Sequence, residues 1–193
     1  MESIDNSLIL WLNSLSGQYH LLDNIVIVIA GDYLLPVYAS LTLLWMWFSQ
    51  ESKTTRVKYQ ISALVAIGSV GLSNFSVRAI MGIFPRARPF EDLPIEVLLY
   101  APTDPSFPSN PVSVLAGIAT AAVIANRKLG AILFGMTFTM AIGRVYAGVA
   151  YPSDVSAGVI VGIGCAFIAF GISKLAYPTV QLLLRAARVF CLA

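Results

Sequence analysis

Charged residues are scarce in this sequence. Lysine, arginine, aspartate and glutamate together make up 11% of the 193 residues, whereas hydrophobic residues make up 58%. A soluble domain carries about 25% charged residues, so the composition excludes an ordinary soluble domain and indicates an integral membrane protein. The formal net charge of +2 also offers no basic surface of the kind that binds nucleic acid.

Histidine and cysteine are rare as well. The single histidine, His20, lies in the N-terminal region, where a lone histidine is typical of a solvated or interfacial residue. Cys165 lies inside an apolar run and Cys191 in the tail, so we expect no disulfide between them. The His, Cys and acidic residues show no metal-ligand spacing, and we expect neither a metal nor another cofactor. The N-terminus also lacks the basic region of a cleaved signal peptide.

Long apolar runs dominate the rest of the chain. A helix needs about 20 mostly apolar residues to cross a bilayer, and five runs come close to or exceed that length: residues 33–48, 59–83, 111–125, 129–149 and 155–175. Residues 21–30 are too short to span unless they join residues 33–48 through a kink at Gly31. Apolar positions spaced through residues 4–15 predict an interfacial helix.

We therefore predict one all-α domain over residues 1–193, a polytopic transmembrane helical bundle. It has five spans, with six as the alternative count, and an N-terminal interfacial helix. Basic residues collect in residues 50–58, in residues 126–130 and in the tail, and five spans place all three on one side. The positive-inside rule makes that side cytoplasmic. We expect a plasma (inner) membrane protein with a cytoplasmic C-terminus.

Four arginines lie near the opposite, extracytoplasmic ends of the predicted spans. They are Arg78, Arg86, Arg88 and Arg144. Charges at a membrane margin are costly and are usually functional. One interpretation pairs them with Glu91, Asp92, Asp104 or Asp154, or lets them snorkel to lipid headgroups. The other, which we favour, is a cluster that binds an anion.

Three short segments at these span ends carry candidate site residues. The segment 85–90 contains Arg88, whose guanidinium fork suits phosphate oxygens. The segment 106–111 predicts a helix start with Asn110 as N-cap and Pro111 as first helical residue. The helix-start amides and the Ser109 hydroxyl would form an anion seat, although a plain helix cap explains this segment equally well. The segment 143–154 ends one apolar stretch and begins the next, with Arg144 and Asp154 inside it.

These segments resemble the three motifs of the type 2 phosphatidic acid phosphatase (PAP2) family of membrane lipid phosphatases. The first motif is a lysine, six residues, then Arg-Pro. Arg88-Pro89 match its end, and Met81 stands at the lysine. Arg78, one turn earlier, would lean toward the site as an auxiliary residue, together with Arg86.

The second and third motifs match in the same partial way. The second is Pro-Ser-Gly-His, with variants at the third position; Pro108 and Ser109 match, Asn110 is a variant and Pro111 replaces the histidine. The third is an arginine, five residues, a histidine, three residues and an aspartate. Arg144 and Asp154 keep that spacing, but Ala150 stands at the histidine. The resemblance covers roughly residues 59–171.

The resemblance implies phosphate binding by Arg88, Ser109, Asn110 and Arg144. In the family, the second-motif histidine donates a proton to the leaving group, and the third-motif histidine attacks phosphorus while the aspartate orients it. With Pro111 and Ala150 in these places, we predict no hydrolysis. Asp154 is then a remnant of the catalytic set, and we expect it to cap the last span or to pair with Arg144 or Arg88.

Three hypotheses about function remain open. The chain is a family member that has lost hydrolysis and still binds a phosphorylated lipid headgroup or a membrane protein partner. Alternatively, it is an active phosphatase or pyrophosphatase whose histidines were replaced, naturally or by engineering. Finally, it is a structural membrane subunit whose arginines make only salt bridges. The resemblance implies as ligands an isoprenyl pyrophosphate such as undecaprenyl pyrophosphate, phosphatidic acid or phosphatidylglycerol phosphate.

Overall fold

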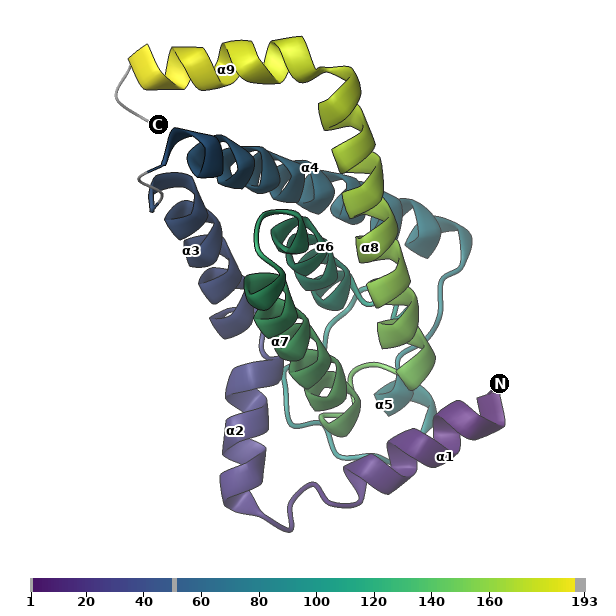
Figure 1. Ribbon diagram of the computed structural model, residues 1–193. Coiled ribbons are helices and arrows are strands. Elements are labelled where there is room, and N and C mark those ends of the chain that lie inside the picture. The colour runs from purple at the N-terminus through teal and green to yellow at the C-terminus, as the bar shows by residue number, and fades with distance from the viewer. Residues whose placement is uncertain (1, 50–51, 190–193) are drawn as a thin grey trace.

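The computed structural model describes residues 2–49 and 52–189, and all regular structure within these ranges is helical (Figure 1). The helices in chain order are α1 (Glu2–Asn13), α2 (His20–Ala30), α3 (Leu34–Phe48), α4 (Lys53–Ile83), α5 (Pro89–Asp92), α6 (Asn110–Ala125), α7 (Arg127–Tyr146), α8 (Pro152–Leu175) and α9 (Tyr177–Val189). The prediction of an all-α membrane bundle is confirmed.

Helix α6 lies at the centre of the bundle, enclosed by α4, α7 and α8 (Figure 1). Ten of its 16 residues are buried. Half of its residues are glycine, alanine, serine or threonine, such as Ala116 and Ala119, so neighbouring helices approach it from several sides. The N-terminus of this central helix is therefore held firmly among the ends of its neighbours.

Two glycines of α8 allow the closest of these approaches. A Cβ atom on Gly158 would lie 2.6 Å from the carbonyl oxygen of Ser109, and one on Gly162 would lie 2.1 Å from that of Ser113. The two glycines are four residues apart and so face α6 together. This small-residue seam fixes α8 against the start of α6, where Ser109 precedes the helix.

The number of membrane spans remains a prediction. Helices α4, α7 and α8 are long and apolar enough to cross a bilayer. The kink expected at Gly31 is present, because α2 and α3 are bent by 46° and would form a fourth span together. Helix α6 is apolar but has only 16 residues. The predicted apolar runs thus correspond to α3, α4, α6, α7 and α8.

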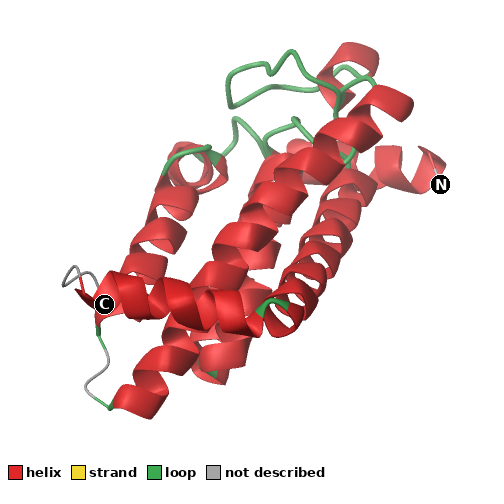
Figure 2. Cartoon of the chain, turned by 90° about the horizontal axis from the view of Figure 1, so that it is seen from above, coloured by secondary structure: helices red, strands yellow, loops and turns green. Residues whose placement is uncertain are grey.

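The bundle has two different ends. Helices α4, α6, α7 and α8 alternate in direction, so the connections α3–α4, α6–α7 and α8–α9 lie at one end, where α9 turns across the bundle (Figure 1). Helix α1, which overlaps residues 4–15 predicted as an interfacial helix, is at the other end with α5. The longest loops gather there as well (Figure 2). His20 is exposed and Cys165 is a buried free thiol, whereas Cys191 lies outside the described residues.

Candidate functional site

Hydrogen bonds join the three segments singled out in the sequence. The amide of Ser109 donates to the carbonyl of Asp154 at 3.0 Å, and the amide of Ser106 donates to the carbonyl of Arg86 at 2.9 Å. The Arg88 guanidinium donates to the carbonyl of Val149 at 2.6 Å. Segments 85–90, 106–111 and 143–154 therefore form one unit at one end of the bundle.

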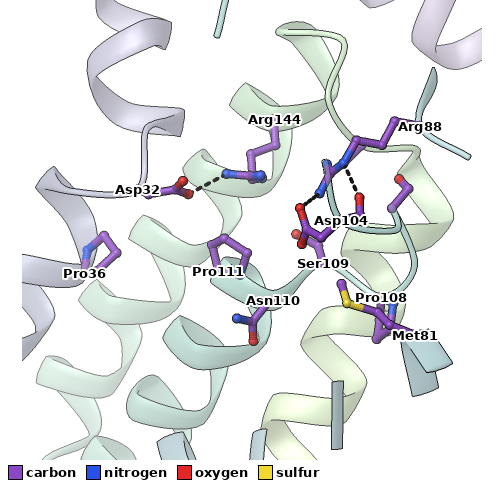
Figure 3. Close-up of a pocket in the computed structure, with 12 residues that line it drawn as sticks. Asp32, Pro36, Met81, Arg88, Asp104, Pro108, Ser109, Asn110, Pro111 and Arg144 are labelled. Atoms are coloured by element: carbon purple, nitrogen blue, oxygen red, sulfur yellow. Dashed lines mark hydrogen bonds and ion pairs between the residues drawn. The ribbon is translucent and has the colours of Figure 1, made fainter. Parts of the chain in front are cut away.

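This unit surrounds a cavity of about 280 Å³ (Figure 3). The walls come from the α2–α3 break, the end of α4, the loop before α6, the start of α6 and the end of α7. The lining residues are Asp32, Pro36, Met81, Arg88, Asp104, Ser106, Pro108, Ser109, Asn110, Pro111, Arg144 and Ala150. The cavity thus brings together all four residues predicted to bind phosphate.

Arg88 lines the cavity and is buried. Its Nε donates to the backbone carbonyl of Asp104 and its Nη2 to Asp104 Oδ1, both at 2.8 Å. With the bond from Nη1 to Val149, all three guanidinium nitrogens have partners. These bonds fix the orientation of the guanidinium at the cavity wall.

Arg144 enters from the last turn of α7 and is also buried. Its Nη1 lies 3.0 Å from Asp32 Oδ1 and 3.2 Å from the carbonyl oxygen of Ala30 (Figure 3). Its Nε is buried and has no hydrogen-bond partner among the described residues. Buried donors are nearly always satisfied, so this nitrogen is an exception, on a residue that lines the cavity.

Asp32 is a site residue that the sequence interpretation missed. It lies at the break between α2 and α3, and its second carboxylate oxygen accepts a hydrogen bond from the Tyr100 hydroxyl. This bond raises the pKa of Tyr100 to about 12. The available signal was an acidic residue between two apolar runs, beside the glycine already identified as a kink.

The start of α6 differs by one residue from the prediction. Ser109 is the N-cap and Asn110 the first helical residue, with Pro111 after it. The Ser109 side chain makes no capping bond, and its Oγ is buried without a partner among the described residues. Asn110 donates through Nδ2 to Asn74 Oδ1 at 3.0 Å. The hydroxyl therefore has no hydrogen-bond partner at the start of α6, and the anion seat expected there stays a prediction.

Asp154 has a structural role, but its partners differ from those predicted. It is fully buried and pairs with Arg86 at 2.8 Å rather than with Arg144 or Arg88. Its Oδ2 accepts the Tyr151 amide at 2.9 Å and the hydroxyl of Ser106. Tyr151 is the N-cap of α8 and Asp154 the third helical residue, so the carboxylate caps the helix from inside its first turn.

The two auxiliary arginines do not line the cavity. Arg86 pairs with Asp154 and, at 3.1 Å, with Asp5, and it donates to Ser153 Oγ at 2.7 Å. Its guanidinium lies 4.0 Å from the centre of the Tyr151 ring. Arg78 is exposed. The prediction of an auxiliary phosphate contact by either residue has no support in this geometry.

The three positions that depart from the family motifs all line the cavity: Met81, Pro111 and Ala150. None of the lining residues carries an imidazole or a thiol. The Ser106 hydroxyl donates to Asp154, whose carboxylate already binds Arg86 and a backbone amide. Both oxygens of that carboxylate therefore have hydrogen-bond partners. Among the described residues, no group of His, Cys or acidic side chains is arranged to hold a metal ion.

Comparison with protein families gives one match over most of the chain. The model of the PAP2 superfamily matches residues 61–177. Two curated proteins are similar in sequence. "Bacitracin transport permease protein BcrC" of Bacillus licheniformis is 28% identical over 83% of this chain and 76% of its own length. "Putative undecaprenyl-diphosphatase YbjG" of Escherichia coli K12 is 30% identical over 86% of this chain and 81% of its own length.

Two crystal structures share the architecture. Aquifex aeolicus LpxE superposes with a TM-score of 0.68 at 28% identity, over 86% of this chain and 93% of its own. The transmembrane PAP2-type phosphatidylglycerolphosphate phosphatase of Bacillus subtilis gives a TM-score of 0.66 at 19% identity, over 90% of this chain and 86% of its own. The second likeness supports the fold alone.

Proposed function

This chain belongs to the PAP2 superfamily, and we propose that its cavity binds the phosphate of a phosphorylated lipid headgroup without hydrolysing it. The ligand classes are those named from the sequence: an isoprenyl pyrophosphate, phosphatidic acid or phosphatidylglycerol phosphate. One relative favours this class, since its name is "Putative undecaprenyl-diphosphatase YbjG".

The observation that carries the binding proposal is a set of buried, unpartnered polar atoms on residues lining one cavity. Arg144 Nε and Ser109 Oγ are buried and have no hydrogen-bond partner among the described residues. An unmade hydrogen bond of a buried group costs about 1–3 kcal/mol. Phosphate oxygens would accept bonds from both donors, with the first amides of α6 nearby.

The proposed loss of hydrolysis rests on the residues at the family's histidine positions. A proline side chain, at position 111, cannot donate a proton, and an alanine side chain, at position 150, cannot attack phosphorus. Asp154, which would orient a histidine, is instead occupied by Arg86, Ser106 and the Tyr151 amide. The chain would then retain the phosphate seat and lack both the nucleophile and the acid.

We further propose that the cavity faces the extracytoplasmic side of the plasma membrane. The support is the distribution of basic residues, because Arg56, Arg127 and Lys174 lie near the opposite end of the bundle from the cavity. By the positive-inside rule that end is cytoplasmic, and α9, the last described helix, lies there too. The bilayer then presents the outer-leaflet headgroups to the cavity.

One observation favours a second function. One relative carries the name of a putative diphosphatase, which keeps open an active phosphatase whose histidines were replaced in this chain. The third hypothesis, a structural subunit without a ligand, is also compatible with two ion pairs. Arg88 pairs with Asp104 and Arg144 with Asp32, so both arginines have an anionic partner without a ligand. Anion binding separates the structural subunit from our proposal, and phosphate release separates the active phosphatase from it.

The test is anion-dependent thermal stabilisation of the protein in detergent micelles. Inorganic phosphate or vanadate should raise Tm, because a ligand that binds the folded state stabilises it by linkage. Arg144→Ala should abolish the shift, since the anion loses a buried cationic partner. Arg78→Ala is the matched control, because Arg78 is exposed and does not line the cavity.

The control should shift with anion as the wild type does. If no anion changes the Tm of the wild type, the arginines only form ion pairs with their aspartates, and the structural-subunit hypothesis replaces ours. If Arg78→Ala loses the shift while Arg144→Ala keeps it, the anion binds elsewhere.

A further inference from the structure

The charges that line the cavity sum to zero. Two cations and two anions are present: Arg88, Arg144, Asp32 and Asp104. Each arginine is paired with one aspartate, at 2.8 Å for Arg88–Asp104 and 3.0 Å for Arg144–Asp32 (Figure 3). A methionine, Met81, occupies the lining position where the family resemblance places a third cation. The lining of the cavity therefore carries no net positive charge that would by itself attract a phosphate dianion.

A bare phosphate dianion would approach two carboxylates along with the two guanidinium groups. Like charges a few ångströms apart in a partly enclosed site repel strongly. A ligand that brings its own cation would relieve that repulsion, because the cation would pair with a carboxylate while the phosphate binds arginine. Charge complementarity of this kind sets which partner a site selects.

The unused hydrogen-bonding groups match such a ligand. Both carboxylate oxygens of Asp32 have partners, Arg144 and Tyr100. Asp104 differs, because Oδ1 accepts from Arg88 while Oδ2 has no partner among the described residues, and its side chain is 56% exposed. Residues that line one cavity thus carry free acceptors, Asp104 Oδ2 and the buried Asn110 Oδ1, and free donors on Arg144 and Ser109.

Resting on the proposed function, we propose that the cavity binds phosphorylated lipids of the classes named above and prefers over them a headgroup that also carries an ammonium group close to its phosphate. The phosphate lies against Arg144, Ser109 and the start of α6, and the ammonium lies against Asp104 Oδ2. Asp104 is the specificity-determining residue. An ammonium is a compact cation with three donors, which suits an acceptor at the rim of the cavity.

The test compares two ligands of nearly equal size that differ in charge. O-phosphoethanolamine carries an ammonium where n-propyl phosphate carries a methyl group. Isothermal titration of the protein in micelles should give a Kd about fivefold lower or better for O-phosphoethanolamine, as expected for a partly exposed ion pair. Asp104→Asn should remove that preference while n-propyl phosphate still binds.

Asp92→Asn is the matched control, because Asp92 is an exposed acid on α5 that does not line the cavity. This variant should keep the preference. A lipid arm repeats the comparison in mixed micelles with phosphatidylethanolamine against phosphatidylpropanol. A preference seen with the soluble pair and absent with the lipid pair would overturn the lipid-headgroup part of the proposal.

The outcomes separate this inference from the proposed function. If both soluble phosphates bind the wild type equally, or if the preference survives Asp104→Asn, the inference is wrong and phosphate binding stands. If neither ligand binds, the proposed function fails as well. The wild-type comparison decides the matter even if Asp104→Asn does not fold.

Discussion

The amide of Ser109 donates a hydrogen bond to the carbonyl oxygen of Asp154 at 3.0 Å. The two residues lie 45 positions apart and belong to two different candidate segments. The bond holds the start of α6 against the first turn of α8, directly beside the cavity. The geometry of the site is therefore built into the helix packing, independently of any ligand.

The buried ion pair beside the cavity should be a major source of local stability. Asp154 is fully buried and Arg86 keeps 29% of its side chain exposed. Arg86→Ala leaves a buried carboxylate without its cation, which costs about 3–5 kcal/mol for a fully buried pair and about 2–3 kcal/mol here because Arg86 is partly solvated. Denaturant unfolding in micelles measures the loss.

A double-mutant cycle with Asp154→Asn checks that this cost belongs to the pair. The double variant should be less destabilised than the sum of the single variants, because each single change removes the same interaction. Strict additivity would mean that Arg86 stabilises the fold through Asp5 and Ser153 instead.

The glycine seam between α6 and α8 gives a matched pair of substitutions on one helix. A Cβ on Gly162 would meet the carbonyl oxygen of Ser113 at 2.1 Å, whereas one on Gly164 meets nothing within 4 Å. Gly162→Ala should destabilise by about 1–3 kcal/mol because the helices must move apart. Gly164→Ala should be neutral or stabilise by up to about 1 kcal/mol through helix propensity. Equal Tm values for the two variants would contradict the packing described.

Reintroducing the two histidines tests whether the rest of the catalytic geometry is intact. Ala150 and Pro111 both line the cavity, so Ala150→His with Pro111→His should give measurable hydrolysis of a lipid phosphate. Ala150→His alone should accumulate phosphoenzyme, because the leaving group still lacks an acid. The readouts are phosphate release and covalent label. A folded double variant that shows no hydrolysis would indicate that the phosphate-binding site itself has been lost.

The Tyr100–Asp32 hydrogen bond predicts a specific alkaline titration. It raises the pKa of Tyr100 to about 12, above the usual value of about 10. Folding therefore favours the neutral phenol, and this contribution is complete below pH 10 and is lost as the pH rises through about 12. The ultraviolet difference titration of wild type against Tyr100→Phe isolates this group. Asp32→Asn should return the transition toward pH 10, and a wild-type Tyr100 titrating there already would refute the bond.

Much of the fold followed from hydropathy, because each long apolar run became a helix. The break at Gly31 was also predictable, since a glycine followed by Asp32 interrupts two apolar runs. The direction in which the Asp32 carboxylate points was not predictable, because it depends on how α2 packs beside α7. No local pattern links Asp32 to Arg144, 112 residues away.

The sequence predicted which segments form the candidate site, but not which side chains pair with one another within it. The spacing of Arg144 and Asp154 suggested a shared role, yet the structure places them in different networks, one with Asp32 and one with Arg86. Arginine side chains reach several ångströms, so helix ends alone leave their pairing undetermined. Asp5 illustrates the same limit, because its contact with Arg86 depends on where α1 docks.

The most direct test of phosphate binding without hydrolysis follows one lipid through both events. Purified protein in micelles is incubated with phosphatidic acid carrying ³²P in its headgroup, and protein-bound lipid and released inorganic phosphate are measured in the same sample. We predict saturable binding of intact lipid, lost in Arg144→Ala, with phosphate release at the background level. Release of phosphate above background by the unaltered chain, or the absence of bound lipid, would contradict the account.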